Sequence, residues 1–143
     1  MRKWNMAAGM MVLLLLAIGM AGCGRSSAQT EKDAVILRVV NQSEVKMDGL
    51  CVSYGDGQAL NGSMGCVNAN GSPWEQGESM ELSFLSSDFE ESDEMILYCS
   101  IRLDDGRIVP VGDPIVVETQ SEEPYEYELV GTGSDSLRLN AVH

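Results

Sequence analysis

The sequence predicts an all-β protein, folded as a single antiparallel β-sandwich of about seven or eight short strands, with a small β-barrel as the alternative. Two observations favour this class. After residue 33, apolar and polar residues alternate in short runs, as they do in half-buried strands. Gly, Asn and Asp residues separate these runs at close spacing, as in the turns of sheet proteins, and no run has helical periodicity over a useful length.

The first half of this region contains four predicted strands, at residues 34–40, 47–54, 59–67 and 78–85. The first strand is apolar on both faces, so we expect it in the middle of a sheet. Asp56-Gly57 is typical of a two-residue hairpin that joins the second strand to the third, because both residues tolerate a positive φ. In the fourth strand, Met80, Leu82 and Phe84 alternate with polar residues, and we expect them to point inward.

The second half adds strands at residues 94–103, 107–111, 115–117 and 125–129, and a final return through Leu137 and Leu139. The strand at 94–103 is the longest, because every second residue from Met95 to Leu103 is apolar. Asp104-Asp105-Gly106 is expected to turn the chain into the next strand. Pro114 opens the strand at 115–117, where proline is tolerated as a first residue.

The segment Ser72-Pro73-Trp74-Glu75-Gln76-Gly77-Glu78 resembles the Pro…Gly-Glu corner that leads into a strand in immunoglobulin-like and fibronectin-like bacterial domains. Together with the order of the strands, this resemblance covers most of residues 34–143 and implies an immunoglobulin-like sandwich. The invariant Cys–Trp–Cys core of true immunoglobulin domains is not visible in the sequence. Because one fold carries many functions, the function must be argued from the residues of a site.

The first 22 residues are predicted to be a secretion signal. Arg2 and Lys3 form a positive start, and the chain is then uncharged as far as Gly24. Within this uncharged stretch, residues 10–18 are strongly apolar. A signal peptidase also needs small side chains just before the cut, and the end of the leader supplies them.

That end, Met20-Ala21-Gly22-Cys23, resembles the lipobox of bacterial lipoproteins, with Met20 where the family usually has Leu. The resemblance implies that the Cys23 thiol is joined to diacylglycerol and that a dedicated peptidase cuts before Cys23. Two acyl chains then hold such a protein at a membrane. We therefore expect a lipid-anchored protein on the extracytoplasmic face of the cell membrane. An uncleaved membrane-spanning helix and ordinary secretion are the alternatives, and both also place the domain outside the cytoplasm.

Composition predicts how the rest of the chain is organised. Residues 23–33 are small and polar without periodicity, which is typical of a flexible tether, and residues 34–143 form the sandwich domain. The whole chain has a net charge of −13. Loss of Arg2 and Lys3 with the leader leaves 7 basic and 22 acidic residues, or −15. This charge opposes binding to nucleic acid and to anionic lipid headgroups, so no nucleic-acid partner is expected.

Three cysteines remain once Cys23 carries lipid, so at most one internal disulfide can form. Cys51 and Cys66 lie on the two strands of the predicted hairpin and are the favoured pair. A tight turn at Asp56-Gly57 would place Gly62 rather than Cys66 opposite Cys51, so free thiols remain an equal alternative. Cys99 is expected to be a small buried apolar residue.

The sequence singles out no metal centre, cofactor or catalytic set. The cysteine spacings match no zinc motif, and the single histidine is His143. The acidic segment 88–94 has carboxylates that calcium prefers but lacks the EF-hand pattern, so a solvated loop is favoured. Trp74 and Tyr54 are weighed as a sugar- or peptide-binding surface against packing in the core, and core packing is favoured.

The predicted function is that of a non-enzymatic binding or interaction module of the cell envelope, with an unknown protein or glycan partner. The first alternative is a structural or accessory subunit of an envelope complex, which an exposed apolar patch or sheet edge would favour. The second is a small hydrolase that uses paired carboxylates, which only a cleft with converging carboxylates of perturbed pKa would favour.

Overall fold

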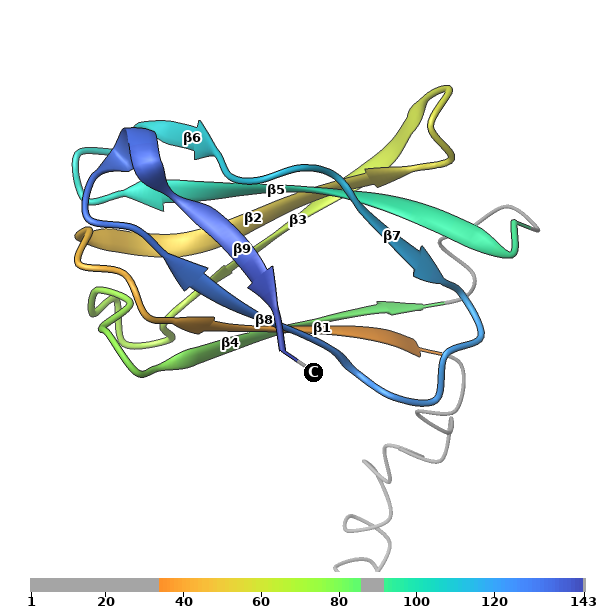
Figure 1. The fold of residues 1–143 in the computed structure, drawn as a ribbon, viewed down its shortest axis with the longest axis horizontal. Helices are drawn as coiled ribbons and strands as arrows, with labels where there is room; N and C mark the ends of the chain where they lie inside the picture. Colours follow the sequence, from red (N-terminus) through yellow and green to blue (C-terminus); the bar gives the residue numbers. More distant parts are fainter. Residues whose placement is uncertain (1–33, 86–91, 143) are drawn as a thin grey trace, which may run out of the picture. The chain divides into compact units, whose positions relative to one another are not determined.

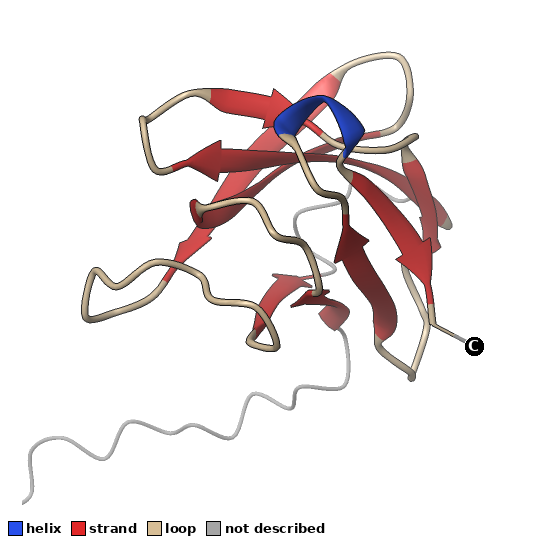
Figure 2. Cartoon of the chain, turned by 60° about the vertical axis from the view of Figure 1, so that its left-hand side comes forward, coloured by secondary structure: helices blue, strands red, loops and turns tan. Residues whose placement is uncertain are grey.

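Two β-sheets pack face to face in residues 34–85 and 92–142, the part of the chain that the computed structural model describes (Figure 1). Nearly all regular structure in this part is strand, and its one helical element is a 3-10 turn at Ser134–Ser136 (Figure 2). The strands are β1 (Ala34–Asn41), β2 (Met47–Gly55), β3 (Leu60–Val67), β4 (Ser79–Leu85), β5 (Glu94–Leu103), β6 (Ile108–Pro110), β7 (Ile115–Glu118), β8 (Tyr125–Val130) and β9 (Arg138–Ala141). The all-β sandwich is therefore confirmed, and these sheets do not close into a barrel.

The order of the strands explains how the sandwich is built. The four-stranded sheet has the order β4-β1-β8-β9, and the five-stranded sheet has the order β3-β2-β5, with both β6 and β7 paired with β5. The chain changes sheet after β1, β3, β4 and β7, whereas β2–β3 and β5–β6 are antiparallel neighbours.

One pairing differs from the predicted antiparallel arrangement. β8 lies parallel to β1, with Leu37 opposite Tyr125 and Asn41 opposite Leu129. Parallel neighbours need a long crossover connection, and here the whole five-stranded sheet lies between β1 and β8 in the sequence. The alternation of apolar residues did not reveal this, because parallel and antiparallel strands have the same period of two.

The turn between β2 and β3 also differs from the prediction. Gly55 lies opposite Leu60, so the loop consists of the four residues from Asp56 to Ala59. Asp56 closes this loop, because its Oδ1 accepts hydrogen bonds from the backbone N–H groups of Ala59 (3.0 Å) and Gln58 (2.8 Å). These bonds favour the charged carboxylate and lower the pKa of Asp56.

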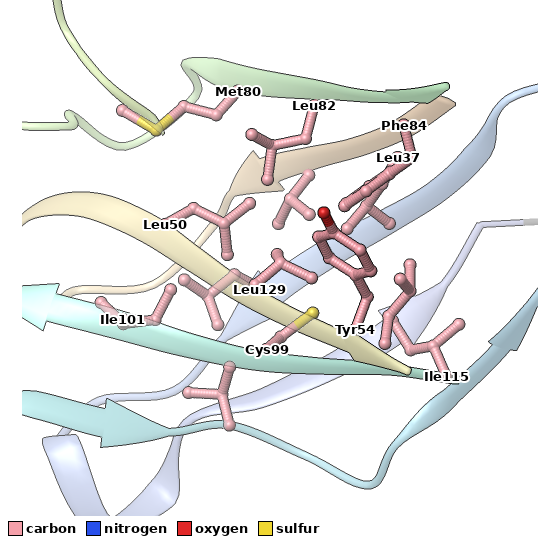
Figure 3. Packing of buried hydrophobic residues seen from close by; sticks show 14 of the residues in the cluster. Leu37, Leu50, Tyr54, Met80, Leu82, Phe84, Cys99, Ile101, Ile115 and Leu129 are labelled. Atoms are coloured by element: carbon pink, nitrogen blue, oxygen red, sulfur yellow. The ribbon is translucent and has the colours of Figure 1, made fainter. Parts of the chain in front are cut away.

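The core fills the space between the sheets (Figure 3). Tyr54 from the five-stranded sheet and Phe84 from the four-stranded sheet meet edge to face, with ring centroids 5.4 Å apart and an interplanar angle of 76°. Such aromatic pairs add to the stability that burial provides. Tyr54 is 9% exposed and Trp74 only 2% exposed, which confirms that both aromatic side chains pack in the core.

A buried polar corner holds the segment that leads into β4. The Nδ2 atom of Asn41 donates to the backbone oxygen of Trp74 (2.8 Å), and its Oδ1 accepts bonds from the backbone N–H (2.9 Å) and the hydroxyl (2.8 Å) of Ser43. The indole Nε1 of Trp74 donates to the backbone oxygen of Glu78 (3.0 Å). These bonds satisfy polar groups that would be costly to bury unpaired, so they fix the corner that the sequence resemblance singles out.

Candidate interaction surface

The outer face of the five-stranded sheet carries most of the exposed large hydrophobic side chains of the described residues. In β5, buried residues alternate with Ile96, Tyr98, Ser100 and Arg102, which point away from the core. The described residues include seven large hydrophobic side chains that are exposed, and five of these belong to this sheet. They are Leu60 (64% exposed), Val67 (50%), Tyr98 (37%), Ile108 (61%) and Val116 (57%).

Strand register places these side chains around a flat centre. Val116 lies opposite Ile96 at one end of β5, and Ile108 lies opposite Arg102 at the other. Between the two ends the outward positions carry small or uncharged residues. Across β3, β2 and β5 they are Ser63, Ser53 and Tyr98 in one row and Gly65, Cys51 and Ser100 in the next. We call this outer side of β3, β2, β5, β6 and β7 the apolar face.

A glycine keeps one large side chain of the apolar face close to the sheet. Gly49 lies opposite Val67. A Cβ atom at Gly49 would lie 2.7 Å from Cγ1 of Val67 and 2.4 Å from the backbone oxygen of Cys66. Any larger residue at Gly49 would therefore displace Val67 or the β3 backbone, so the flatness of this part of the face depends on glycine.

Charged side chains lie at the two ends of the apolar face, whereas on the other side of the sandwich they lie across the middle of the sheet. Arg102 and Asp48 approach to 3.9 Å at one end of the apolar face, and Glu94 lies opposite Glu118 at the other. The outer side of the four-stranded sheet instead presents carboxylates on neighbouring strands, with Arg38 between two of them. Its acidic residues are Glu81, Glu126 and Glu128.

Arg38 organises that charged side. Its Nη2 lies 2.9 Å from Oε2 of Glu81 on β4, and its Nη1 lies 2.5 Å from Oε1 of Glu126 on β8. The hydrogen bonds to Glu81 and Glu126 raise the pKa of the guanidinium. All three side chains are substantially exposed, so solvent screens the pairs. Even so, Arg38 is a positive group between two strands that are both negatively charged.

The structure does not bring Cys51 and Cys66 together as a disulfide. Cys51 lies opposite Gly65, and Cys66 lies opposite Leu50. Adjacent residues of a strand point to opposite faces, so Cys51 is on the apolar face while Cys66 packs against the core. Both thiols are free. The four-residue loop sets this register, and a Cys51–Cys66 bridge would require a different one.

Cys99 lies where the sequence predicts it, buried in the core at 4% exposure. Burial raises the pKa of its thiol to about 12, because an apolar environment disfavours the thiolate. The side chain is therefore an apolar packing residue rather than a nucleophile at neutral pH.

Several of the sequence-based expectations fall outside the described residues. These include the leader, Cys23 and the tether, His143, and most of the acidic segment 88–94. Among residues 34–85 and 92–142, no helix is both long and apolar enough to span a bilayer. The same residues form no cluster of three or more His, Cys, Asp or Glu side chains suited to a metal ion.

The two carboxyl groups with a lowered pKa, within the described part, both lie in turns. Asp105 accepts a bond from the backbone N–H of Arg107 (3.0 Å) and another from its Nε (2.7 Å), and these bonds lower the pKa of Asp105. Asp56 closes the loop between β2 and β3 in the same manner. Both carboxyl groups have a structural role, because they stabilise tight turns.

The sequence pattern did not single out the apolar face. Its large side chains come from four different strands, and alternation within a strand does not show which strands are neighbours in the sheet. A usable signal was present, because no residue from Gly57 to Trp74 is charged although the chain is strongly acidic. That uncharged stretch includes all of β3.

No protein-family model matches this chain, and no curated protein matches it. Two solved structures resemble it. One is an NMR structure of a protein from Eubacterium rectale, with a TM-score of 0.46, 10% identity, and coverage of 80% of this chain and 93% of that one. The other is the crystal structure of listeriolysin O, with a TM-score of 0.39 and 6% identity over 76% of this chain and 22% of that one. At these TM-scores, neither likeness bears on the function of this chain.

Proposed function

We propose that this protein is a lipid-anchored extracytoplasmic protein that acts as a non-enzymatic interaction module of the cell envelope. One structural observation supports the interaction role: five of the seven exposed large hydrophobic side chains in the described residues share a single sheet. Soluble monomers usually scatter such side chains over their surface, so the gathering of most of them on one sheet supports a surface that another molecule covers.

The anchor rests on the leader. A basic start, an apolar core and Met20-Ala21-Gly22-Cys23 together resemble the signal of a bacterial lipoprotein. In this proposal, lipid on Cys23 holds the chain at the membrane and residues 24–33 connect it to the sandwich. Charge would not provide that attachment, because an acidic domain is repelled by anionic headgroups.

The apolar face determines the kind of partner we propose. Full burial of one large apolar side chain contributes about 1.5–3 kcal/mol, so the half-exposed side chains of this face can supply several kcal/mol together. The small residues in the centre allow close approach of a flat surface. The partner we propose is therefore a protein with a flat, apolar and weakly charged surface rather than a basic ligand.

The accessory-subunit role is a second candidate, and a specific observation favours it. The exposed apolar groups lie on a sheet face, not in the loops at the ends of the sandwich. A broad face suits lasting assembly with one partner better than recognition of varied ligands by loops. The two roles differ in stoichiometry, since an accessory subunit would remain in a fixed ratio to its partner after extraction.

The size of the complex extracted from membranes tests the proposal. We expect the full-length protein to migrate in an assembly larger than two copies of itself. Replacement of Ile108 and Val116 by Glu should release it, because two carboxylates would then be buried at the contact. Ser83→Glu is the matched control, since Ser83 is an exposed β4 residue on the other sheet. If all three proteins migrate at the size of the chain alone or of a simple dimer, the proposal is wrong.

A further inference from the structure

β3 is an edge strand that lacks the charged residues and proline of the other edges. β4 carries Glu81 on its outer side, and β9 is short and begins with Arg138. The edge opposite β3 is divided between β6 and β7, and it contains Pro110. By contrast, the eight residues of β3 include no charge and no proline. Natural sheets usually guard an exposed edge with such residues, because its unpaired backbone groups can bind another strand.

The pattern of charge favours a second copy of this chain as the occupant of that edge. A second copy carries the same net charge of −13, so it is repelled wherever carboxylates are dense. From Gly57 to Trp74 there is no charged residue, and β3 lies within this stretch. A second copy that approaches along β3 therefore meets no carboxylate on the strand itself.

The strand is also complementary to itself. Asn61 is the extra residue of a bulge, since Gly62 lies opposite Tyr54 and Leu60 lies opposite Gly55. The seven remaining positions of β3 that pair with β2 have Met64 at their centre. An antiparallel pair of β3 strands with Met64 on the two-fold axis sets Leu60 of each copy opposite Val67 of the other.

That register covers the exposed side chains of the edge. Leu60 is 64% exposed and Val67 is 50% exposed, and the pair occurs twice because the axis is two-fold. Between these contacts, Ser63 lies opposite Gly65 of the second copy, so small residues meet in the middle. Cross-strand apolar pairs stabilise a sheet, and a two-fold contact of this kind closes and stops growth at two copies.

We infer that the protein forms a dimer in which the β3 strands of two copies pair antiparallel and join their five-stranded sheets into one. This pairing uses the sheet edge and leaves Tyr98, two strands away, uncovered. It therefore goes beyond the proposed function, and either one can fail without the other.

Disulfide trapping of the full-length protein in detergent tests the register. We expect the double variant with Leu60→Cys and Val67→Cys to give a covalent dimer under mild oxidation. Each single variant should give no more than the parent protein, because Leu60 of one copy is far from Leu60 of the other in this register. A mixture of the two single variants should again give the dimer. If the double variant gives no more dimer than the single variants, the inference is overturned.

A matched pair of charge variants distinguishes a dimer contact through the β3 edge from one through the apolar face. Ser63→Glu places a carboxylate on β3 and should raise the dimer dissociation constant at least about tenfold in sedimentation equilibrium. Ser53 lies opposite Ser63 on β2, one strand in from the edge, so Ser53→Glu should leave that constant unchanged. Equal loss in both variants would show that copies meet through the face, and a parent protein that is monomeric at micromolar concentration would overturn the dimer itself.

Discussion

At Gly62 on β3, the buried ring of Tyr54 leaves no room for a larger side chain. A Cβ atom there would lie 2.5 Å from the hydroxyl oxygen of Tyr54, and the Tyr54 ring is held in place by Phe84. Overpacking of a core in this way costs about 1–3 kcal/mol. The ring of Tyr54 thus lies across a glycine of the neighbouring strand and compensates for its missing side chain.

Gly62→Ala should therefore lower the free energy of unfolding by about 1–3 kcal/mol, measured by urea denaturation. Gly65→Ala is the matched control on the same strand, because its Cβ would meet Cys51 Sγ at an ordinary 4.0 Å. We expect the control to change stability by less than about 0.5 kcal/mol. If the two variants had the same urea midpoint, the Tyr54 ring would have to move aside without loss of stability.

The buried thiol of Cys99 makes a specific contribution to the pH dependence of stability. Its pKa is about 12 in the folded protein, against an ordinary value of 9.0. Above that ordinary value the unfolded chain loses a proton that the folded chain keeps, so stability falls as pH rises from 9 toward 12. Below pH 9 the group has no such effect.

Cys99→Val should remove this contribution. From about pH 8 to pH 10, the parent protein should lose about 1 kcal/mol more stability than the variant. The loss comes from the pH unit above 9, where the unfolded thiol is ionised and the folded thiol is not, and one such unit corresponds to about 1.36 kcal/mol. The comparison cancels most of the contribution of the tyrosines and lysines, which both proteins share, and Tyr127 is the exception because Cys99 helps to raise its pKa. Parallel loss of stability in the two proteins would show that the Cys99 thiol ionises as easily when folded as when unfolded.

Among the strands, the charged side of the four-stranded sheet depends on Arg38. Glu81 and Glu126 lie on the two neighbours of β1, and Arg38 lies between them. Arg38→Gln should lower the urea midpoint in low salt, because like charges on neighbouring strands then remain without a cation. The difference from the parent protein should shrink in high salt, since exposed pairs are screened. A midpoint independent of salt in both proteins would contradict this role.

Strand positions followed from the sequence wherever alternation was strong. β5 has the predicted bounds, and β4 begins one residue later than predicted, since a buried face imposes a period of two. The parallel pairing of β8 with β1 and the loop from Asp56 to Ala59 could not be derived, because both depend on the packing of distant segments. The apolar face required knowledge of which strands are neighbours, so no single segment indicated it.

For the molecule as a whole, the two outer faces have different roles in our account. The four-stranded sheet presents Glu81, Glu126 and Glu128, whose negative charge opposes contact with another acidic molecule. The five-stranded sheet presents the apolar face, which we propose is covered in the envelope. An exported protein at a membrane surface would then repel other acidic proteins with its four-stranded sheet and bind its partner with its five-stranded sheet.

The anchor gives a prediction at the same scale. Cys23→Ser should leave an unprocessed precursor that is released or mislocalised, because the proposed lipid attachment and cleavage both require the thiol. Intact-mass measurement of the membrane-extracted parent protein should show loss of residues 1–22 and the added mass of lipid. A mass equal to residues 1–143 without lipid would remove the anchor.

Site-specific crosslinking in living cells tests the central claim most directly. A photoreactive amino acid at Tyr98 lies in the middle of the apolar face, whereas the same group at Asn140 lies on β9, in the other sheet. Our account predicts a discrete crosslinked partner from position 98 and none from position 140. The absence of any crosslink from position 98, or the same products from both positions, would contradict it.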